Sequence, residues 1–272
     1  MLELTPLSGA SAALSRSQNR AAVMHELRRL LPACEGSHKE GSYKILSFGL
    51  AALDDHLPEG GLACSALHEV VAESERALPA AFGFIVAFLA RIASPTPLIF
   101  ILPAYGRRQH GGLSGHGLNS LGLDPGRLIL VETAHRKETL WAVAEALRST
   151  APQAVAAMID KLDLKTSQKL QLAAHDAGLP LLLLRPAQTL EASAAATRWR
   201  IGTAEAVRDR FGLYARPRWR LQLERCRNGR PGEWLVEYDH VTHCFSLAAA
   251  LADPAFSRGT GDRSRRQAAI GF

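Results

Sequence analysis

The chain has 272 residues, of which 47% are hydrophobic, so it can bury a core the size of one large domain. Its four cysteines (Cys34, Cys64, Cys226 and Cys244) form no Cys-x-x-Cys pair, which argues against a disulfide framework or zinc ribbon and favours the reducing cytoplasm. Residues 1–20 contain no unbroken apolar run typical of a signal peptide. The longest uncharged helical candidate, Ala77 to Ala90, is shorter than the roughly 20 residues that span a bilayer. We therefore expect a soluble cytoplasmic protein with no membrane contact.

The formal net charge of +6 is concentrated toward the C-terminal end. Ten arginines and three acidic residues lie between Arg198 and Arg230, and four arginines and one aspartate lie between Arg258 and Arg266. The rest of the chain is net acidic. This asymmetry indicates a polyanion or an acidic protein as partner.

Residues 1–44 are predicted to form an N-terminal helical arm. In the segment 20–31, Met24, Leu27 and Leu31 fall on one helical face, and a proline follows. The helix either packs on its own domain, the interpretation we favour, or docks on a neighbouring subunit.

Residues 45–250 are predicted to form an α/β core with a mostly parallel sheet covered by helices on both faces. Five continuous apolar runs read as strands: Leu67 to Val71, Leu98 to Leu102, Leu128 to Val131, Ala154 to Ile159 and Leu181 to Leu184. Helical stretches separate them, among which are Pro79 to Ile92, Glu138 to Arg148 and Thr166 to Ala177. Strands that are apolar on both faces indicate a sheet buried on both sides.

The first of these strands is followed by a segment where a phosphate-binding loop would be expected. Such a loop needs a Lys for the phosphates and a Ser or Thr hydroxyl for magnesium. This chain has Ala77, Leu78 and Pro79 instead. Proline suits the first turn of a helix but offers neither an N–H nor a hydroxyl. We expect a helix to begin here without a phosphate site, and hence no nucleotide cofactor and no catalysis.

Two carboxylates occupy positions that are suggestive of an ATPase. Asp160 follows an apolar strand, where phosphate-loop ATPases place the residue that organises magnesium, and Glu138 begins a helix, where an activating glutamate would be placed. Each has a structural interpretation as well: Asp160 caps the next turn, and Glu138 favours the helix dipole. We favour the structural interpretation for both.

Two further segments look like sites but carry weak signals. The Gly-rich stretch from Tyr105 to Asn119 is interpreted as a mobile surface loop because it lacks the strand–loop–helix setting of an anion site. His240, His243 and Cys244 lack a second ligand pair at zinc-finger spacing, so we expect no metal.

After about residue 198 the pattern changes to short Arg-rich strands: Thr197 to Ile201, Arg218 to Arg225 and Glu233 to Tyr238. An Asn-Gly turn at residues 228–229 predicts a β-hairpin that closes the sheet. The end of the chain, residues 251–272, is predicted to be a disordered basic tail.

The Arg-rich strands carry two tryptophans, Trp199 and Trp219, each flanked by arginines. The rings either stack on the bases of single-stranded DNA or, because side chains alternate along a strand, point into the core. We favour burial of the rings. In either case the arginines are candidates for DNA or partner binding: Arg198, Arg200, Arg216, Arg218, Arg220, Arg225, Arg227 and Arg230.

Several segments together resemble the ImuA family of RecA-like mutagenesis proteins, which is related to RecA and to the cell-division inhibitor SulA. They are LSFGLAALDDHLPEGGL (residues 46–62), LHEVV, GLDPGRLILVE, KETLWAVAEALRS, LPLLLLRP, ATRWRI and RPRWRLQLERCRNGRPGEWLVEYD. Their order is more specific than any one of them, and the resemblance covers roughly residues 44–250.

The resemblance implies a RecA-like core and a role in translesion synthesis during DNA-damage-induced mutagenesis (the SOS response). It implies partners as well: an ImuB-like Y-family pseudo-polymerase and an error-prone polymerase α subunit, with RecA and single-stranded DNA as further candidates. With the phosphate loop missing, we expect a non-catalytic accessory factor that provides a binding platform. The alternatives are a divergent DNA-dependent ATPase of RecA type that uses Asp160 and Glu138, and a SulA-like division inhibitor.

Overall fold

The computed structural model describes residues 44–92, 94–189, 191–208, 211 and 214–248. Apart from Lys44, the predicted N-terminal arm (residues 1–44) lies outside the described residues, and so does the predicted basic tail (residues 251–272).

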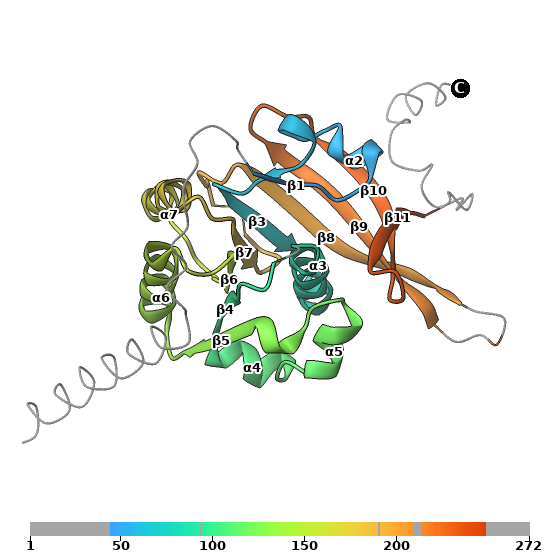
Figure 1. Cartoon of the computed structure of the whole chain (residues 1–272), viewed down its shortest axis with the longest axis horizontal. Coiled ribbons are helices and arrows are strands. Elements are labelled where there is room, and N and C mark those ends of the chain that lie inside the picture. Colours follow the sequence, from blue (N-terminus) through green and yellow to red (C-terminus); the bar gives the residue numbers. More distant parts are fainter. Residues whose placement is uncertain (1–43, 93, 190, 209–210, 212–213, 249–272) are drawn as a thin grey trace, which may run out of the picture.

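In the described part of the chain, nine strands form one sheet in the order β11-β10-β9-β8-β3-β7-β6-β4-β5 (Figure 1). Six of them, β3 to β8, run parallel, and β9, β10 and β11 extend the sheet antiparallel beyond β8. The bounds are β3 Leu67–Ala72, β4 Leu98–Pro103, β5 Leu128–Thr133, β6 Ala154–Met158, β7 Leu181–Arg185, β8 Thr197–Arg208, β9 Tyr214–Cys226, β10 Gly232–Asp239 and β11 Cys244–Leu247. Two short strands, β1 (Ile45–Leu46) and β2 (Leu62–Ala63), pair separately.

The helices lie on both faces of the sheet. They are α2 Ala51–Asp54, α3 Leu78–Ala90, α4 Ala104–His110, α5 Gly115–Ser120, α6 Arg136–Ser149 and α7 Leu164–Ala177, with short 3-10 turns η1 Pro58–Gly60, η2 Glu75–Ala77 and η3 Pro125–Arg127. Local contacts mark where α7 begins and ends. The Asp163 carboxylate accepts the Thr166 N–H at the start of α7, and Gly178 ends that helix in the left-handed region at φ 65°.

Each face of the sheet has its own hydrophobic core. On one face, α3 packs with Phe48 and with residues of β8, β9 and β10, and on the other face α6 and α7 pack on the parallel strands (Figure 1). All six residues of β3 are buried, since this central strand is covered on both sides. The predicted α/β class with a mostly parallel sheet and helices on both faces is confirmed.

The structure corrects two expectations. The hairpin around Asn228 exists between β9 and β10, but β11 pairs with β10 and forms the edge of the described sheet, so the hairpin does not close it. The segment from Tyr105 to Asn119, expected to be a mobile loop, forms most of α4 and α5. The Ser114 hydroxyl caps α5 by accepting the Gly117 N–H, a local contact that glycine content alone conceals. None of the helices that the structure describes is long and apolar enough to cross a membrane.

A buried hydrogen-bond network ties the centre of the sheet together. His68 on β3 and Thr197 on β8 are register partners, and their Nδ1 and Oγ1 atoms lie 2.8 Å apart. The His68 Nε2–H donates to the Ala63 carbonyl oxygen at 2.9 Å, and the Trp199 indole N–H donates to the Thr197 hydroxyl at 3.0 Å. Burial lowers the pKa of His68 to about 4, so the imidazole is neutral in the folded protein at pH 7.

The lowered pKa predicts a loss of stability in mild acid. Below pH 6.5 the unfolded chain takes up a proton on His68, whereas the folded protein does so only near pH 4. The free energy of unfolding should therefore fall between these values and be unaffected by this group above them. We expect the change with pH in this window to be smaller in His68→Gln, measured by urea unfolding at a series of pH values. Parallel curves for the two proteins would contradict the assignment.

Candidate functional site

The turn between β3 and α3 occupies the place where a phosphate loop was considered. Residues 73–76 are exposed, and η2 leads directly into α3. The side chains of Ala77 and Leu78 are 2% and 3% exposed and belong to the hydrophobic core under α3, whereas Pro79 is exposed in its first turn. The two positions before the proline therefore offer a phosphate neither charge nor hydroxyl.

Acidic residues make this turn less suitable for an anion. Glu73 and Glu75 are both exposed and stand before the N-terminus of α3, a helix end that would otherwise attract phosphate. Glu73 is held in place by Arg220, whose Nη1 lies 2.7 Å from its Oε1. Its position also requires Gly202 on β8, where an added Cβ would lie 1.9 Å from Glu73 Oε2.

Asp160 and Glu138 make local contacts. Asp160 is exposed two residues after β6, and its carboxylate accepts the Lys161 N–H at 2.8 Å. Glu138 in the first turn of α6 accepts the Ala134 N–H at 2.7 Å, while its own N–H donates to the His135 imidazole. These are the turn and helix-capping contacts of the structural interpretation.

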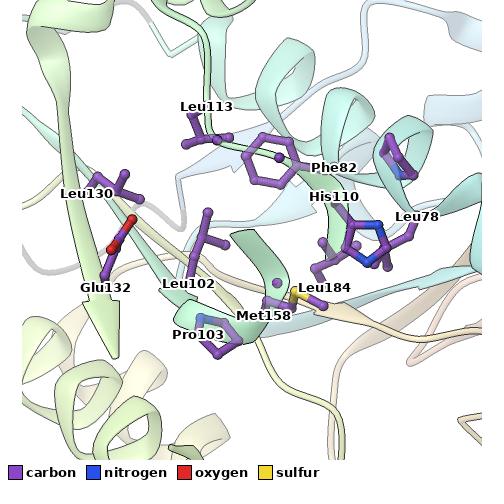
Figure 2. Close-up of a pocket in the computed structure, with 14 residues that line it drawn as sticks. Leu78, Phe82, Leu102, Pro103, His110, Leu113, Leu130, Glu132, Met158 and Leu184 are labelled. Atoms are coloured by element: carbon purple, nitrogen blue, oxygen red, sulfur yellow. The ribbon is translucent and has the colours of Figure 1, made fainter. Parts of the chain in front are cut away.

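An apolar pocket of about 130 Å³ lies at the carboxyl ends of the parallel strands (Figure 2). It is lined by the start of α3, the ends of β4, β6 and β7, two exposed residues of β5, α4 and the connection between α4 and α5: Leu78, Pro79, Phe82, Leu102, Pro103, Gly106, His110, Gly111, Gly112, Leu113, Leu130, Glu132, Met158 and Leu184. Gly106 allows α4 to approach β6, since a Cβ there would lie 3.1 Å from the Met158 sulfur. Sequence reasoning misses this pocket because its residues resemble ordinary core at strand ends. The glycines at residues 111 and 112 are the one feature of the sequence that could have indicated the pocket.

The two tryptophans of the Arg-rich strands are buried. Trp199 is 0% and Trp219 is 5% exposed, and both pack in the core beside Phe84. The favoured interpretation of the rings as core is confirmed, so neither ring is presented for base stacking.

The eight candidate arginines lie on β8, on β9 and in the turn that follows, and all of them have partners within the protein. Five contact carboxylates: Arg198 with Glu69, Arg200 with Glu224, Arg216 with Glu237 and Asp239, Arg218 with Glu237, and Arg220 with Glu73. Three donate to backbone carbonyls: Arg225 to Ala195, Arg227 to Ala194 and Arg230 to Asp55. Carboxylates therefore neutralise five of these eight arginines, and the three that contact carbonyls keep their charge.

The ion pair of Arg198 with Glu69 differs from the other four arginine contacts because its carboxylate is fully buried. The Glu69 side chain is 0% and that of Arg198 15% exposed, with 2.7 Å between Nη2 and Oε2. Arg185, 1% exposed, lies near the same carboxylate, and burial lowers the pKa of its guanidinium. Glu69 Oε1 and Arg185 Nε and Nη1 have no hydrogen-bond partner among the described residues.

His240 and His243 contact other groups of the protein. His240 donates from Nδ1 to the Ser120 carbonyl oxygen at 2.9 Å, and His243 Nδ1 lies 3.3 Å from the Tyr238 hydroxyl. Among the described residues, no group of three His, Cys, Asp or Glu side chains is arranged to hold a metal ion.

The chain has relatives among known proteins. No family model matches it. Protein ImuA of Caulobacter vibrioides strain NA1000 / CB15N is 33% identical over 228 residues, which cover 77% of this chain and 91% of the relative. The chain belongs to the ImuA family. ImuA of C. vibrioides strain ATCC 19089 matches this ImuA-family protein with the same identity and coverage.

A solved structure, the KaiC-like protein PH0186 from Pyrococcus horikoshii OT3, matches 76% of this chain and 100% of its own length at 12% identity, with a TM-score of 0.48. The RecA-like α/β fold expected for an ImuA-family protein agrees with the sheet order and the two helical layers described above.

The burial of an ion pair predicts how much unfolding free energy is lost when its arginine is replaced. Replacing Arg198 by Gln should cost about 3 kcal/mol of unfolding free energy, because the Glu69 charge is left buried without its partner. Replacing Arg220 by Gln should cost less than about 1 kcal/mol, because its pair with Glu73 is more than a third exposed on both sides. Urea unfolding followed by circular dichroism measures both. Equal losses would show that burial does not rank these pairs.

Proposed function

We propose that this ImuA-family protein is a non-catalytic accessory factor in DNA-damage-induced mutagenesis. In this role it serves translesion synthesis as a binding platform beside an ImuB-like Y-family pseudo-polymerase and an error-prone polymerase α subunit, with RecA and single-stranded DNA as further candidate partners. Family membership supports the process, since the relatives are named ImuA.

The turn between β3 and α3 is the observation that carries the non-catalytic part of the proposal. A phosphoryl-transfer site depends on positioned cations and backbone donors around the phosphates. Here Ala77 and Leu78 turn their side chains into the core, and Glu73 and Glu75 precede the helix. An anionic nucleotide would meet two carboxylates in place of a lysine.

The antiparallel extension of the sheet supports the platform part. Beyond β8, the face opposite the tryptophans carries four arginines and four carboxylates in contact: Arg200, Arg216, Arg218 and Arg220 with Glu73, Glu224, Glu237 and Asp239. A surface on which positive and negative side chains are paired suits a partner protein with its own charged groups. DNA would bind there only if its phosphates replaced the carboxylates as partners of the arginines.

The purified full chain is expected to show neither saturable ATP binding nor hydrolysis, with or without single-stranded DNA. Asp160→Asn and Glu138→Gln serve as matched variants and should behave as the parent does, since each carboxylate accepts the N–H of a nearby backbone group. Equilibrium binding of labelled ATP and release of phosphate are the measurements. DNA-stimulated turnover that Asp160→Asn abolishes would replace the platform with a divergent ATPase.

Two changes on the sheet face opposite the tryptophans should affect DNA binding in opposite directions. Replacing Arg216, Arg218 and Arg220 together by Gln should weaken binding to single-stranded DNA and reduce its logarithmic salt slope by about two, since each lost phosphate contact removes about 0.7. Glu237→Gln releases Arg218, while Arg216 keeps its pair with Asp239 at 3.0 Å, and should tighten binding. Fluorescence anisotropy at several salt concentrations measures both. If neither variant changes the slope, the arginines serve the sheet or a protein partner.

A further inference from the structure

A second pocket, of about 400 Å³, lies at the amino ends of β3 and β8, whereas the apolar pocket lies at the carboxyl ends of the parallel strands. Its walls come from three separate parts of the chain: η1 and β2, the second half of α7, and the turn between β9 and β10. Small-molecule sites span roughly 300 to 1,000 Å³, so this pocket has room for a small ligand.

Hydrogen bonds hold these walls together. The Arg230 N–H in the β9–β10 turn donates to the His56 carbonyl oxygen at 2.9 Å, which fixes the segment that leads into η1. The Gln171 side-chain oxygen accepts the Leu67 N–H at 2.9 Å, which fixes α7 against the start of β3. A pocket whose walls are already fixed loses little conformational freedom when a ligand binds.

Two side chains of opposite charge line the pocket from different walls. Glu59 lies in η1, Arg227 lies in the β9–β10 turn, and both are exposed. Neither has an oppositely charged partner among the described residues, and Arg227 Nη2 donates to the Ala194 carbonyl oxygen at 3.1 Å instead. The pocket therefore presents one carboxylate and one guanidinium to a ligand.

The backbone holds Glu59 in an unusual conformation. Its φ of 57° lies in the left-handed region, which residues other than glycine adopt infrequently. Such a conformation persists only where the surrounding structure imposes it, and here the Gly60 N–H donates to the Leu57 carbonyl oxygen and the Gly61 N–H to that of Pro58. Because the backbone sets the direction of the Cβ atom, this turn fixes the start of the Glu59 side chain at the pocket wall.

The rest of the lining favours a ligand with an apolar body and both charges. A ligand with only a negative charge would meet Glu59, and one with only a positive charge would meet Arg227. A ligand that carries a carboxylate and an ammonium group would pair with both. Apolar residues supply much of the remaining wall: Ile45, Pro58, Leu62, Ala66 and Ala196.

We propose that this pocket binds a zwitterionic small molecule with an apolar body, its carboxylate at Arg227 and its ammonium group at Glu59. A planar guanidinium matches a carboxylate because two of its N–H groups can donate in parallel to the two oxygens. The site goes beyond the accessory role, and its test does not depend on that role.

Calorimetric titration of the full chain with two zwitterionic probes tests the proposal. L-Phenylalanine carries its two charges next to each other, and ε-aminocaproate carries them at the two ends of an apolar chain. Each is compared with its singly charged analogues, which are hydrocinnamate and phenethylamine for the first and hexanoate and hexylamine for the second. At least one zwitterion should bind about fivefold more tightly than both of its analogues, because it makes one charge pair more than either.

Uncharged variants assign each end of the ligand. Arg227→Gln should weaken binding of the zwitterion and of the carboxylate analogue by about fivefold and leave the ammonium analogue unchanged, whereas Glu59→Gln should weaken the zwitterion and the ammonium analogue. Arg148→Gln on α6 is the matched control, since it removes an exposed arginine outside the pocket, and should bind every probe as the parent does. If Arg227→Gln does not fold, Asn228→Asp adds a carboxylate at a left-handed position that aspartate tolerates, and should weaken the carboxylate analogue relative to the ammonium analogue.

Each other outcome overturns the proposal. If neither zwitterion binds, the pocket is not a site for this class of ligand. Equal affinities for a zwitterion and its singly charged analogues would remove the pairing of charges with Glu59 and Arg227. Equal losses of affinity in Arg227→Gln and Arg148→Gln would mean that the probes bind outside the pocket.

Discussion

The parallel pairing of β3 with β8 joins the two halves of this protein. Two successive register pairs carry polar contacts across it: His68 bonds to Thr197, and Glu69 pairs with Arg198. Both contacts are buried, where an unpaired polar group is costly, so the register between the parallel core and the antiparallel extension is strongly specified. The turn that leaves β3 and the Arg-rich face that begins on β8 both take their positions from this pairing.

Because β8 follows β3 in register, a residue at the end of β3 contacts the antiparallel strands. Glu73 reaches Arg220 on β9 over Gly202 of β8. The turn that leads into α3 thus supplies one of the carboxylates that pair with the arginines of the antiparallel strands.

The carboxyl ends of the parallel strands line an apolar pocket. Strand ends that could hold polar groups instead present Leu102, Met158 and Leu184 to a small apolar pocket. Glu132 gives that pocket a charged side.

The sequence by itself determined the fold class, the lack of the lysine and hydroxyl of a phosphate-loop motif, and the burial of the tryptophans. Continuous apolar runs encode strands covered on both faces, residue types encode what a loop can bind, and two-residue alternation encodes which ring faces the core. The tertiary structure alone decided the partners of the arginines, the pocket, the two short helices near residue 110 and the edge strand β11. The reason is distance along the chain: Arg198 is 129 residues from Glu69, and Arg220 is 147 residues from Glu73. Local periodicity predicts whether a side chain is buried, but only the order of the strands in the sheet brings such distant charges together. A count of arginines in the sequence therefore overstated the positive charge on the folded surface, because it left out the carboxylates that pair with them.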